Sequence, residues 1–362
     1  MCDTTRLSLV VVITALLCSG VVDSMPTFTL GEYAGGPRLH NGRLDIAATV
    51  EWMNAVAANT FNVLLWDTTG DDYLDLVELA AALSANSTNG TLTTVWATLI
   101  PPTEAASRCS VPADSPLTPW NETTLFDQTL GLKGCEDYVA WGVALGKLAT
   151  LYPAFAAANI DDFGTETNLV HHFNASYVRA IRGGLNSGGA HLIPTAYYAD
   201  PSGDDKTFIL ERYPWVLGAT DGLMLYFRND KAGQDMCRQS AACTASQLPA
   251  GCHMPCLSGT CADASESSLL SELTDMHTLM DPVGQRLFLG EYFSGYSHCN
   301  PYGPSTAYNA NVTSQALFGA ARQLLDGLMV YTTRPPPRAA CEGNATKSKD
   351  CTISVLFHEA RR

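Results

Sequence analysis

The chain has 362 residues, 36 acidic against 21 basic side chains and a formal net charge of −15, with 46% hydrophobic and 16% charged residues. This abundance of apolar residues and shortage of charge exclude an intrinsically disordered chain. No Lys/Arg-rich run is present, which argues against a nucleic-acid partner, and the acidity argues against anionic membranes and sulfated glycans. The length suits one large domain or two ordinary ones.

The first 24 residues have the three-part pattern of a secretory signal peptide. A weakly basic start, Met1–Arg6, precedes an uninterrupted apolar run, Leu7–Leu17, and small residues follow it. The run is shorter than the ~20 residues that span a bilayer, so we predict cleavage after Ser24 and a secreted protein rather than a membrane anchor. Because no later segment reaches that length, no stable membrane association is expected.

Cysteines and glycosylation motifs agree with an oxidising, extracellular compartment. Removal of the signal peptide leaves ten of the 12 cysteines, an even number that fits five disulfide bonds. Five of them crowd residues 237–261 beside His253, where a disulfide-stapled loop is favoured over a zinc site because the paired CxxC spacing is missing. Six Asn-x-Ser/Thr motifs, which predict surface glycans, begin at Asn86, Asn89, Asn121, Asn174, Asn311 and Asn344.

Short apolar runs alternate with segments of helical period along the rest of the chain. Continuous apolar strands that alternate with helices indicate a parallel sheet covered on its outer face. The predicted strands are Phe28–Tyr33, Phe61–Asp67, Thr94–Ile100, Ala154–Ile160, His191–Tyr198, Gly222–Phe227, Arg286–Tyr292 and Gly327–Thr332. The predicted helices cover about residues 45–58, 71–83, 136–151, 175–185, 207–213, 266–280 and 314–325.

Eight such units indicate an α/β fold of the (β/α)8 TIM-barrel type. We predict one barrel over residues 25–334, with a cysteine-rich loop insertion at about 228–264 and a disulfide-tied C-terminal tail at 335–362. An open, doubly wound sheet is the alternative, although no GxGxxG motif follows the first strand. Nothing in the sequence indicates an oligomeric state.

The carboxyl ends of the predicted strands carry carboxylates interleaved with aromatic residues, and TIM barrels place their active sites at this end. Sugar rings have apolar faces that stack on Trp and Tyr, and their hydroxyl groups bind carboxylates and amides. We therefore expect a carbohydrate substrate or ligand. The candidate substrate-binding residues are Glu32, Tyr33, Trp66, Asp67, Asn159, Tyr197, Tyr226, Tyr292 and Tyr296.

The strongest local signal is the segment NIDDF, in which Asp161 and Asp162 directly follow the apolar run AFAAA of strand four. Two adjacent carboxyl groups do not both ionise freely, so the pKa of one is expected to rise, as a general acid at neutral pH requires. A helix N-cap or a turn is the alternative interpretation of the pair. Asp161 and Asp162 are therefore candidate catalytic residues.

An Asp-Asp pair that closes strand four of a TIM barrel resembles the glycoside hydrolases that use substrate-assisted catalysis on N-acetylated sugars. The resemblance implies that Asp161 orients the acetamido group of the substrate and that Asp162 is the general acid/base. The DxxDxDxE pattern of the chitinase-like branch is absent. This chain also resembles the retaining barrel glycosidases. These enzymes carry a Glu nucleophile at the end of strand seven, which is the position of Glu291 in this sequence.

Glu291 is thus the third candidate catalytic residue, with a carboxylate paired to an arginine at the rim as the alternative. It belongs to the motif LGEY, which occurs at Leu30–Tyr33 and again at Leu289–Tyr292. We predict a secreted glycoside hydrolase with a paired-carboxylate mechanism and no cofactor or metal. The alternatives are a non-catalytic carbohydrate-binding barrel and a secreted barrel hydrolase or lyase of other chemistry.

Overall fold

The computed structural model describes residues 25–33, 35–65, 71–86, 93–104, 137–197, 213–226, 268–292 and 306–331. All 12 cysteines lie outside these ranges, together with the predicted signal peptide, the cysteine-rich insertion and the C-terminal tail. The predicted disulfides, the zinc alternative and the domain boundaries therefore stay predictions. The helix predicted at 207–213 also lies outside the described residues, except for Tyr213.

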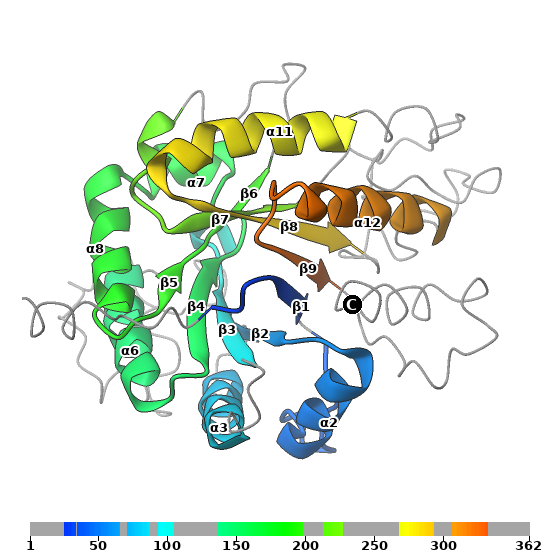
Figure 1. Cartoon of the computed structure of the whole chain (residues 1–362). Helices are drawn as coiled ribbons and strands as arrows, with labels where there is room; N and C mark the ends of the chain where they lie inside the picture. The colour runs from blue at the N-terminus through cyan, green and yellow to red at the C-terminus, as the bar shows by residue number, and fades with distance from the viewer. Residues whose placement is uncertain are drawn as a thin grey trace, which may run out of the picture.

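Strands and helices alternate along the chain, with the strands at the centre and the helices around them (Figure 1). The strands are β1 (Thr29–Tyr33), β2 (Thr60–Leu65), β3 (Thr94–Leu99), β4 (Phe155–Ile160), β5 (His191–Leu192), β6 (Thr195–Tyr197), β7 (Gly222–Tyr226), β8 (Arg286–Tyr292) and β9 (Gly327–Tyr331). The helices are α2 (Ile46–Val56), α3 (Asp71–Asn86), α6 (Tyr138–Leu151), α7 (Glu166–His171), α8 (Ala175–Asn186), α11 (Ser268–Met280) and α12 (Thr306–Ala321), with short 3-10 turns at Pro214–Val216 and Asp281–Val283.

All the strands pair in parallel and form one sheet that closes on itself. The order is β5-β4-β3-β2-β1-β9-β8-β7-β6, so the two end strands are neighbours in the chain, separated by Ile193 and Pro194. The Ile193 N–H donates to Ala158 of β4 at 2.9 Å, and Met224 of β7 donates to the Pro194 carbonyl at 3.0 Å. The predicted strand His191–Tyr198 is thus interrupted where proline has no N–H to donate, and the (β/α)8 barrel is confirmed.

Two helices begin where the sequence supplies a capping carboxylate. Asp45 accepts the Ala48 N–H at 3.0 Å before α2, and Asp137 accepts the Ala140 N–H at 2.9 Å before α6. These bonds satisfy N–H groups that lack partners inside the first turn of a helix. The last helix differs from its prediction, because α12 begins at Thr306 rather than Ser314 and its first turns are polar.

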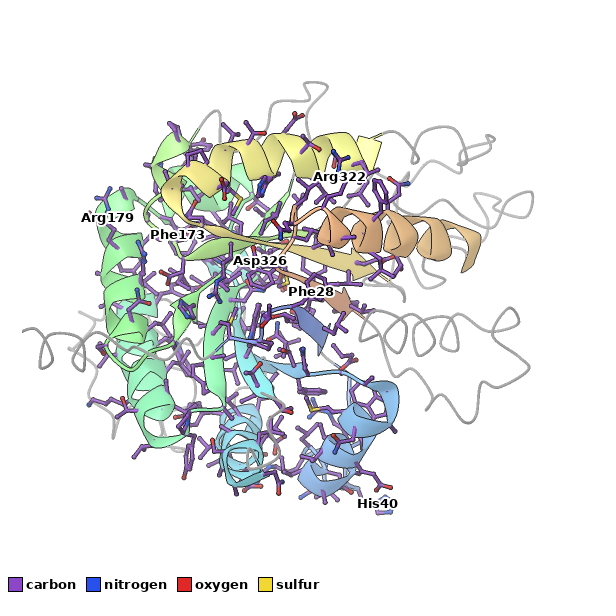
Figure 2. All side chains as sticks on the ribbon, viewed as in Figure 1. Phe28, His40, Phe173, Arg179, Arg322 and Asp326 are labelled. Atoms are coloured by element: carbon purple, nitrogen blue, oxygen red, sulfur yellow. The ribbon has the colours of Figure 1, made fainter. Side chains whose placement is uncertain are left out.

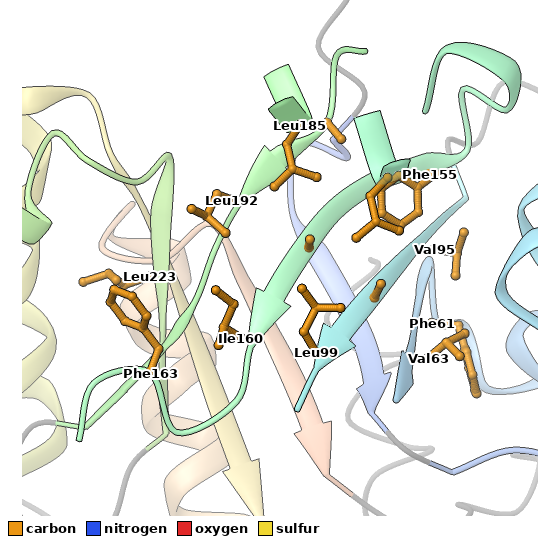
Figure 3. Close-up of a cluster of buried hydrophobic side chains, with 14 of the residues drawn as sticks. Phe61, Val63, Val95, Leu99, Phe155, Ile160, Phe163, Leu185, Leu192 and Leu223 are labelled. Carbon is orange, nitrogen blue, oxygen red and sulfur yellow. The ribbon is translucent and has the colours of Figure 1, made fainter. Parts of the chain in front are cut away.

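Alternate residues of a strand face opposite sides of the sheet, which divides the core into two layers. On β9, Leu328 and Val330 belong to the outer layer between strands and helices, whereas Met329 belongs to the inner layer inside the barrel. Figure 3 shows part of the outer layer, with Phe155 and Ile160 both on β4. This alternation decides which strand-end side chains face the mouth of the barrel.

Three strands are held at their amino ends by the same device. The residue just before one strand uses a side-chain oxygen to accept the N–H of the second residue of another strand. Such bonds fix the strands at the end of the barrel that confers stability rather than chemistry. The pairs are Leu30 with Asn59 at 2.8 Å, Leu192 with Asp221 at 2.9 Å and Leu287 with Asp326 at 2.8 Å; Asp326 is labelled near the centre of Figure 2.

Candidate functional site

A group of aromatic and acidic side chains gathers at the carboxyl ends of β1, β4, β7 and β9. It comprises Tyr33, Asp161, Tyr226 and Tyr331, which we call the mouth cluster. The Tyr33 hydroxyl donates to Oδ2 of Asp161 at 3.3 Å, a contact between residues that are 128 positions apart. The Tyr33 ring centroid lies 5.1 Å from that of Tyr331 and 6.5 Å from that of Tyr226. The cluster joins four strands.

Accessibility differs within the mouth cluster. Tyr33 and Tyr226 are only 3% and 2% exposed, whereas Asp161 and Tyr331 are partly exposed. Burial, and then the negative charges of Asp161 and Glu32, raise the pKa of the Tyr331 hydroxyl. Tyr331 therefore stays protonated at neutral pH and remains a hydrogen-bond donor. A ligand at the mouth would meet Asp161 and Tyr331, while the other two rings support them.

Three neighbouring strands, β1, β9 and β8, each end in a tyrosine, and their register aligns these three residues. The segments LGEY of β1, LMVY of β9 and LGEY of β8 lie side by side, so Tyr33, Tyr331 and Tyr292 occupy one row. The glycines of this repeat leave room inside the barrel. A Cβ at Gly31 would lie 2.6 Å from the Met329 sulfur, and one at Gly290 would lie 2.6 Å from the Tyr226 ring. The repeated motif therefore reflects shared packing around β9.

The Asp-Asp pair lies in a tight turn after β4. Oδ1 of Asp161 accepts the Asp162 N–H at 2.9 Å, and Asp162 adopts a left-handed backbone with φ of 46°. The Asp162 carbonyl accepts three bonds, from the N–H and hydroxyl of Thr165 at 3.1 and 3.0 Å and from Nδ2 of the buried Asn168 at 2.8 Å. Non-glycine residues with this backbone are uncommon and cluster at functional sites. These bonds fix the backbone of the turn, and the bond from the Asp162 N–H also fixes the carboxylate of Asp161.

Polar side chains that the sequence analysis largely missed lie inside the barrel below the pair. Asn159 precedes Asp161 on the same strand face, and its Oδ1 accepts the Thr195 hydroxyl at 3.0 Å. On the neighbouring strands, Oδ1 of Asn62 accepts the Thr98 hydroxyl at 2.9 Å. The signal that could have found them is the presence of amide and hydroxyl side chains inside otherwise apolar strands.

Three buried N–H donors of this region have no acceptor among the described residues: Nδ2 of Asn62, Nε1 of Trp96 and Nδ2 of Asn159. Trp96 and Asn62 are in direct register on adjacent strands. A buried donor without an acceptor costs about 1–3 kcal/mol. The interior below Asp161 therefore favours an oxygen acceptor, from water or from a ligand group.

The two glutamates of the LGEY motifs face away from the mouth. Glu32 and Glu291 both pair in register with Val330, whose side chain belongs to the outer layer. The Thr313 hydroxyl of α12 donates to Oε2 of Glu291 at 2.8 Å, and both glutamates are buried, at 0% and 2% exposure. Strand alternation therefore turns Glu291, the predicted nucleophile, and Glu32, the predicted sugar contact, toward the helices.

Several predicted site residues have no described side chain. Trp66, Asp67 and Tyr296 lie outside the described residues. Tyr197 and Tyr292 are placed only by backbone register, opposite Tyr226 and Tyr331 respectively. Within the part of the chain that the structure describes, no group of three or more His, Cys, Asp or Glu residues is arranged to hold a metal ion.

An ion network joins the segment after β1 to α3 without involving the side chains of the mouth cluster. Arg43 donates to Asp75 at 2.6 Å and to Glu78 at 3.1 Å, and Asp75 also accepts the Leu44 N–H at 2.8 Å. These bonds fix the segment after β1 onto α3. His40, at the tip of that segment, lies at the periphery of the molecule (Figure 2). We assign this network a structural role.

No protein-family model matches the chain, and no curated protein sequence matches it. Solved structures match its fold. A GH113 β-1,4-mannanase has a TM-score of 0.50 at 11% identity, covering 92% of this chain and 99% of that one. The chain is a TIM barrel. A Cellulomonas fimi endo-β-1,4-mannanase double mutant also has a TM-score of 0.50 at 11% identity, covering 91% of this chain and 70% of that one.

Structures of fungal β-1,4-galactanases match this TIM barrel with a TM-score of 0.47 at 10% identity, covering 92% of this chain and 100% of theirs. These neighbours are glycoside hydrolases, but at such identities the likeness shows the fold alone.

Among the described residues, no helix has both the length and the apolar character needed to cross a membrane.

Proposed function

We propose that this TIM barrel is a glycoside hydrolase whose chemistry is carried by Asp161 and Asp162. The observation that carries the proposal is the position of Asp161 at the mouth, beside the partly exposed Tyr331. The Asp161 carboxylate accepts the Tyr33 hydroxyl at 3.3 Å and the Asp162 N–H at 2.9 Å. A carboxylate next to an aromatic face suits a sugar ring, which offers both an apolar face and hydroxyl groups.

The geometry suggests different roles for the two carboxylates. The Tyr33 hydroxyl and the Asp162 N–H each donate to a carboxylate oxygen of Asp161, so this carboxylate acts as an acceptor. In that position it suits stabilisation of an oxocarbenium-like centre, or orientation of the acetamido group of an N-acetylated sugar. Asp162 then serves as general acid/base toward the glycosidic oxygen. Asn159, below the pair, offers its Nδ2 to a ligand oxygen.

A non-catalytic carbohydrate-binding barrel is the second candidate. The observation that favours it is the orientation of Glu291, because the described mouth then contains no third carboxylate that could act as a nucleophile. Under this alternative the tyrosines bind sugar while Asp161 and Asp162 only shape the turn.

We further propose that the chain is secreted and glycosylated. The support comes from the apolar run at residues 7–17, the even cysteine count after Ser24 and the six Asn-x-Ser/Thr motifs.

Turnover of aryl glycosides and of N-acetylated polysaccharides by the wild-type protein and its variants tests the proposed function. Asp162→Asn is expected to lower kcat about 10²–10⁴-fold, because it removes the acid/base. The fold should survive, because asparagine tolerates the left-handed backbone at this position. Asp137→Asn is the matched control: it makes the same change at the α6 N-cap, where asparagine also caps.

Three outcomes separate the candidates. Turnover that falls in Asp162→Asn and not in Asp137→Asn supports hydrolysis by the pair. Oligosaccharide binding without turnover in the wild-type protein supports the binding barrel. Turnover that is unchanged in Asp162→Asn removes Asp162 from the mechanism and contradicts the proposal.

A further inference from the structure

Among the six Asn-x-Ser/Thr motifs, the one at Asn174 has a fully described setting. Asn174 is exposed and is the N-cap residue of α8, with an extended backbone at φ −142° and ψ 168°. Its Oδ1 accepts the Tyr177 N–H at 3.0 Å and the Ser176 hydroxyl at 2.7 Å. Both partners follow it in the chain, and Ser176 is the hydroxyl residue of the motif itself.

These bonds fix the orientation of the Asn174 amide. The amide NH2 of asparagine is a donor and cannot accept the Tyr177 N–H, so Oδ1 faces the first turn of α8 and Nδ2 points away from it. The neighbouring side chains show the same division: Phe173 points into the molecule and is 5% exposed, whereas Arg179 of α8 points outward (Figure 2). The amide nitrogen is therefore presented on the exposed side of the cap.

We propose that Asn174 carries an N-linked oligosaccharide and that this site keeps its helix cap when the glycan is attached. In the transfer, Nδ2 forms a bond to C1 of the oligosaccharide and loses one proton. The C1–O bond of the lipid-linked oligosaccharyl diphosphate donor breaks, and the diphosphate leaves with the electron pair. Oδ1 takes no part, so it continues to accept the two bonds of the cap.

This inference depends on entry into the secretory pathway and is independent of the proposed glycosidase activity. Asn86, at the end of α3, is exposed but has no described Ser or Thr beside it. Asn311 lies within α12, and the motifs at 89, 121 and 344 lie outside the described residues. Asn174 is the position where attachment and structure can be tested together.

The first test is peptide mapping of the full chain after expression in a eukaryotic host. The tryptic peptide of residues 148–179 contains Asn174 and no other of the six motifs. We expect this peptide to carry hexosamine and to lose it on treatment with a peptide:N-glycanase, which leaves aspartate at 174. Recovery of the peptide wholly unmodified, from cells and medium alike, overturns the proposal.

The second test separates the glycan from the cap. Asn174→Asp and Asn174→Ala should both lose the glycan, but only alanine removes the side-chain acceptor. Because the glycanase also leaves aspartate at 174, Asn174→Asp should have the Tm of the enzymatically deglycosylated wild-type protein, and Asn174→Ala should have a Tm about 1–3 °C below both. Equal Tm values for the two variants would overturn the claim that the glycosylated residue is also the cap.

Discussion

Glu291 is a buried acid that faces the helices rather than the mouth. Burial raises its pKa well above the ordinary value, and the bond from Thr313 offsets only part of that effect. Glu32 lies on the same face of the sheet, on the far side of Val330, and Glu272 of α11 is another buried acid among the described residues. The folded protein therefore holds a proton on Glu291 at pH values at which the unfolded chain has released it. The contribution of Glu291 to the free energy of unfolding is fully present below the ordinary glutamate pKa. It is lost as the pH rises toward the pKa of the folded state.

The change Glu291→Gln should remove this contribution to pH dependence. Glutamine is neutral at all pH values and keeps an oxygen for the Thr313 hydroxyl. Within that pH range we expect the free energy of unfolding of the wild-type protein to fall more steeply, by up to about 1.4 kcal/mol per pH unit, than that of the variant. Urea unfolding between pH 5 and 8 measures both curves.

Glu51→Gln, the same change at an exposed position of α2, is the control for this experiment. Its curve should be parallel to that of the wild-type protein. If Glu291→Gln also leaves the slope unchanged, Glu291 is not the protonated, buried acid that the structure indicates.

At the scale of elements, α6 and α8 approach closely through glycines. A Cβ at Gly184 of α8 would lie 2.7 Å from backbone atoms of Gly142 and Val143, and one at Gly142 would lie 2.5 Å from the Ile181 carbonyl. Backbone atoms cannot move aside as a flexible side chain can. The two helices therefore need glycine at these positions, although glycine weakens a helix by about 1 kcal/mol relative to alanine.

Neighbouring glycines of α8 provide a matched pair of variants. Gly184→Ala should destabilise the protein by at least about 1–3 kcal/mol, because the added methyl group overlaps α6. A Cβ at Gly183 meets no atom within 4 Å, so Gly183→Ala should stabilise the helix by up to about 1 kcal/mol. Chemical denaturation of both variants gives the comparison. Similar effects of the two changes would contradict the close contact of α6 and α8.

For the whole molecule, the barrel could be predicted because each strand is a short, continuous apolar run followed by a segment of helical period. The predicted Arg286–Tyr292 agrees with β8, and the predicted helix at 175–185 with α8. The interruption at Pro194 and the polar start of α12 were not predicted. The first follows from the missing N–H of proline, and in the second the helix extends over residues without a clear apolar period.

The orientation of strand-end side chains could not be predicted in the same way. In a barrel strand both faces are buried, so LFLGEY has no alternation of apolar and polar residues to show which face is inside. One position of register decides whether Glu291 faces the mouth or the helices. Asp161 was easier to find, because the turn after β4 brings it out of an alanine-rich strand.

The central claim is that the acids of the turn after β4 act in function and that the buried acid Glu291 acts in structure. The most direct test is kcat/KM for Asp162→Asn and Glu291→Gln, measured side by side on the substrate that the wild-type protein turns over best. We predict a loss of about 10²-fold or more for Asp162→Asn and a change of no more than about threefold for Glu291→Gln. A large loss in folded Glu291→Gln protein together with full activity of Asp162→Asn would contradict the account.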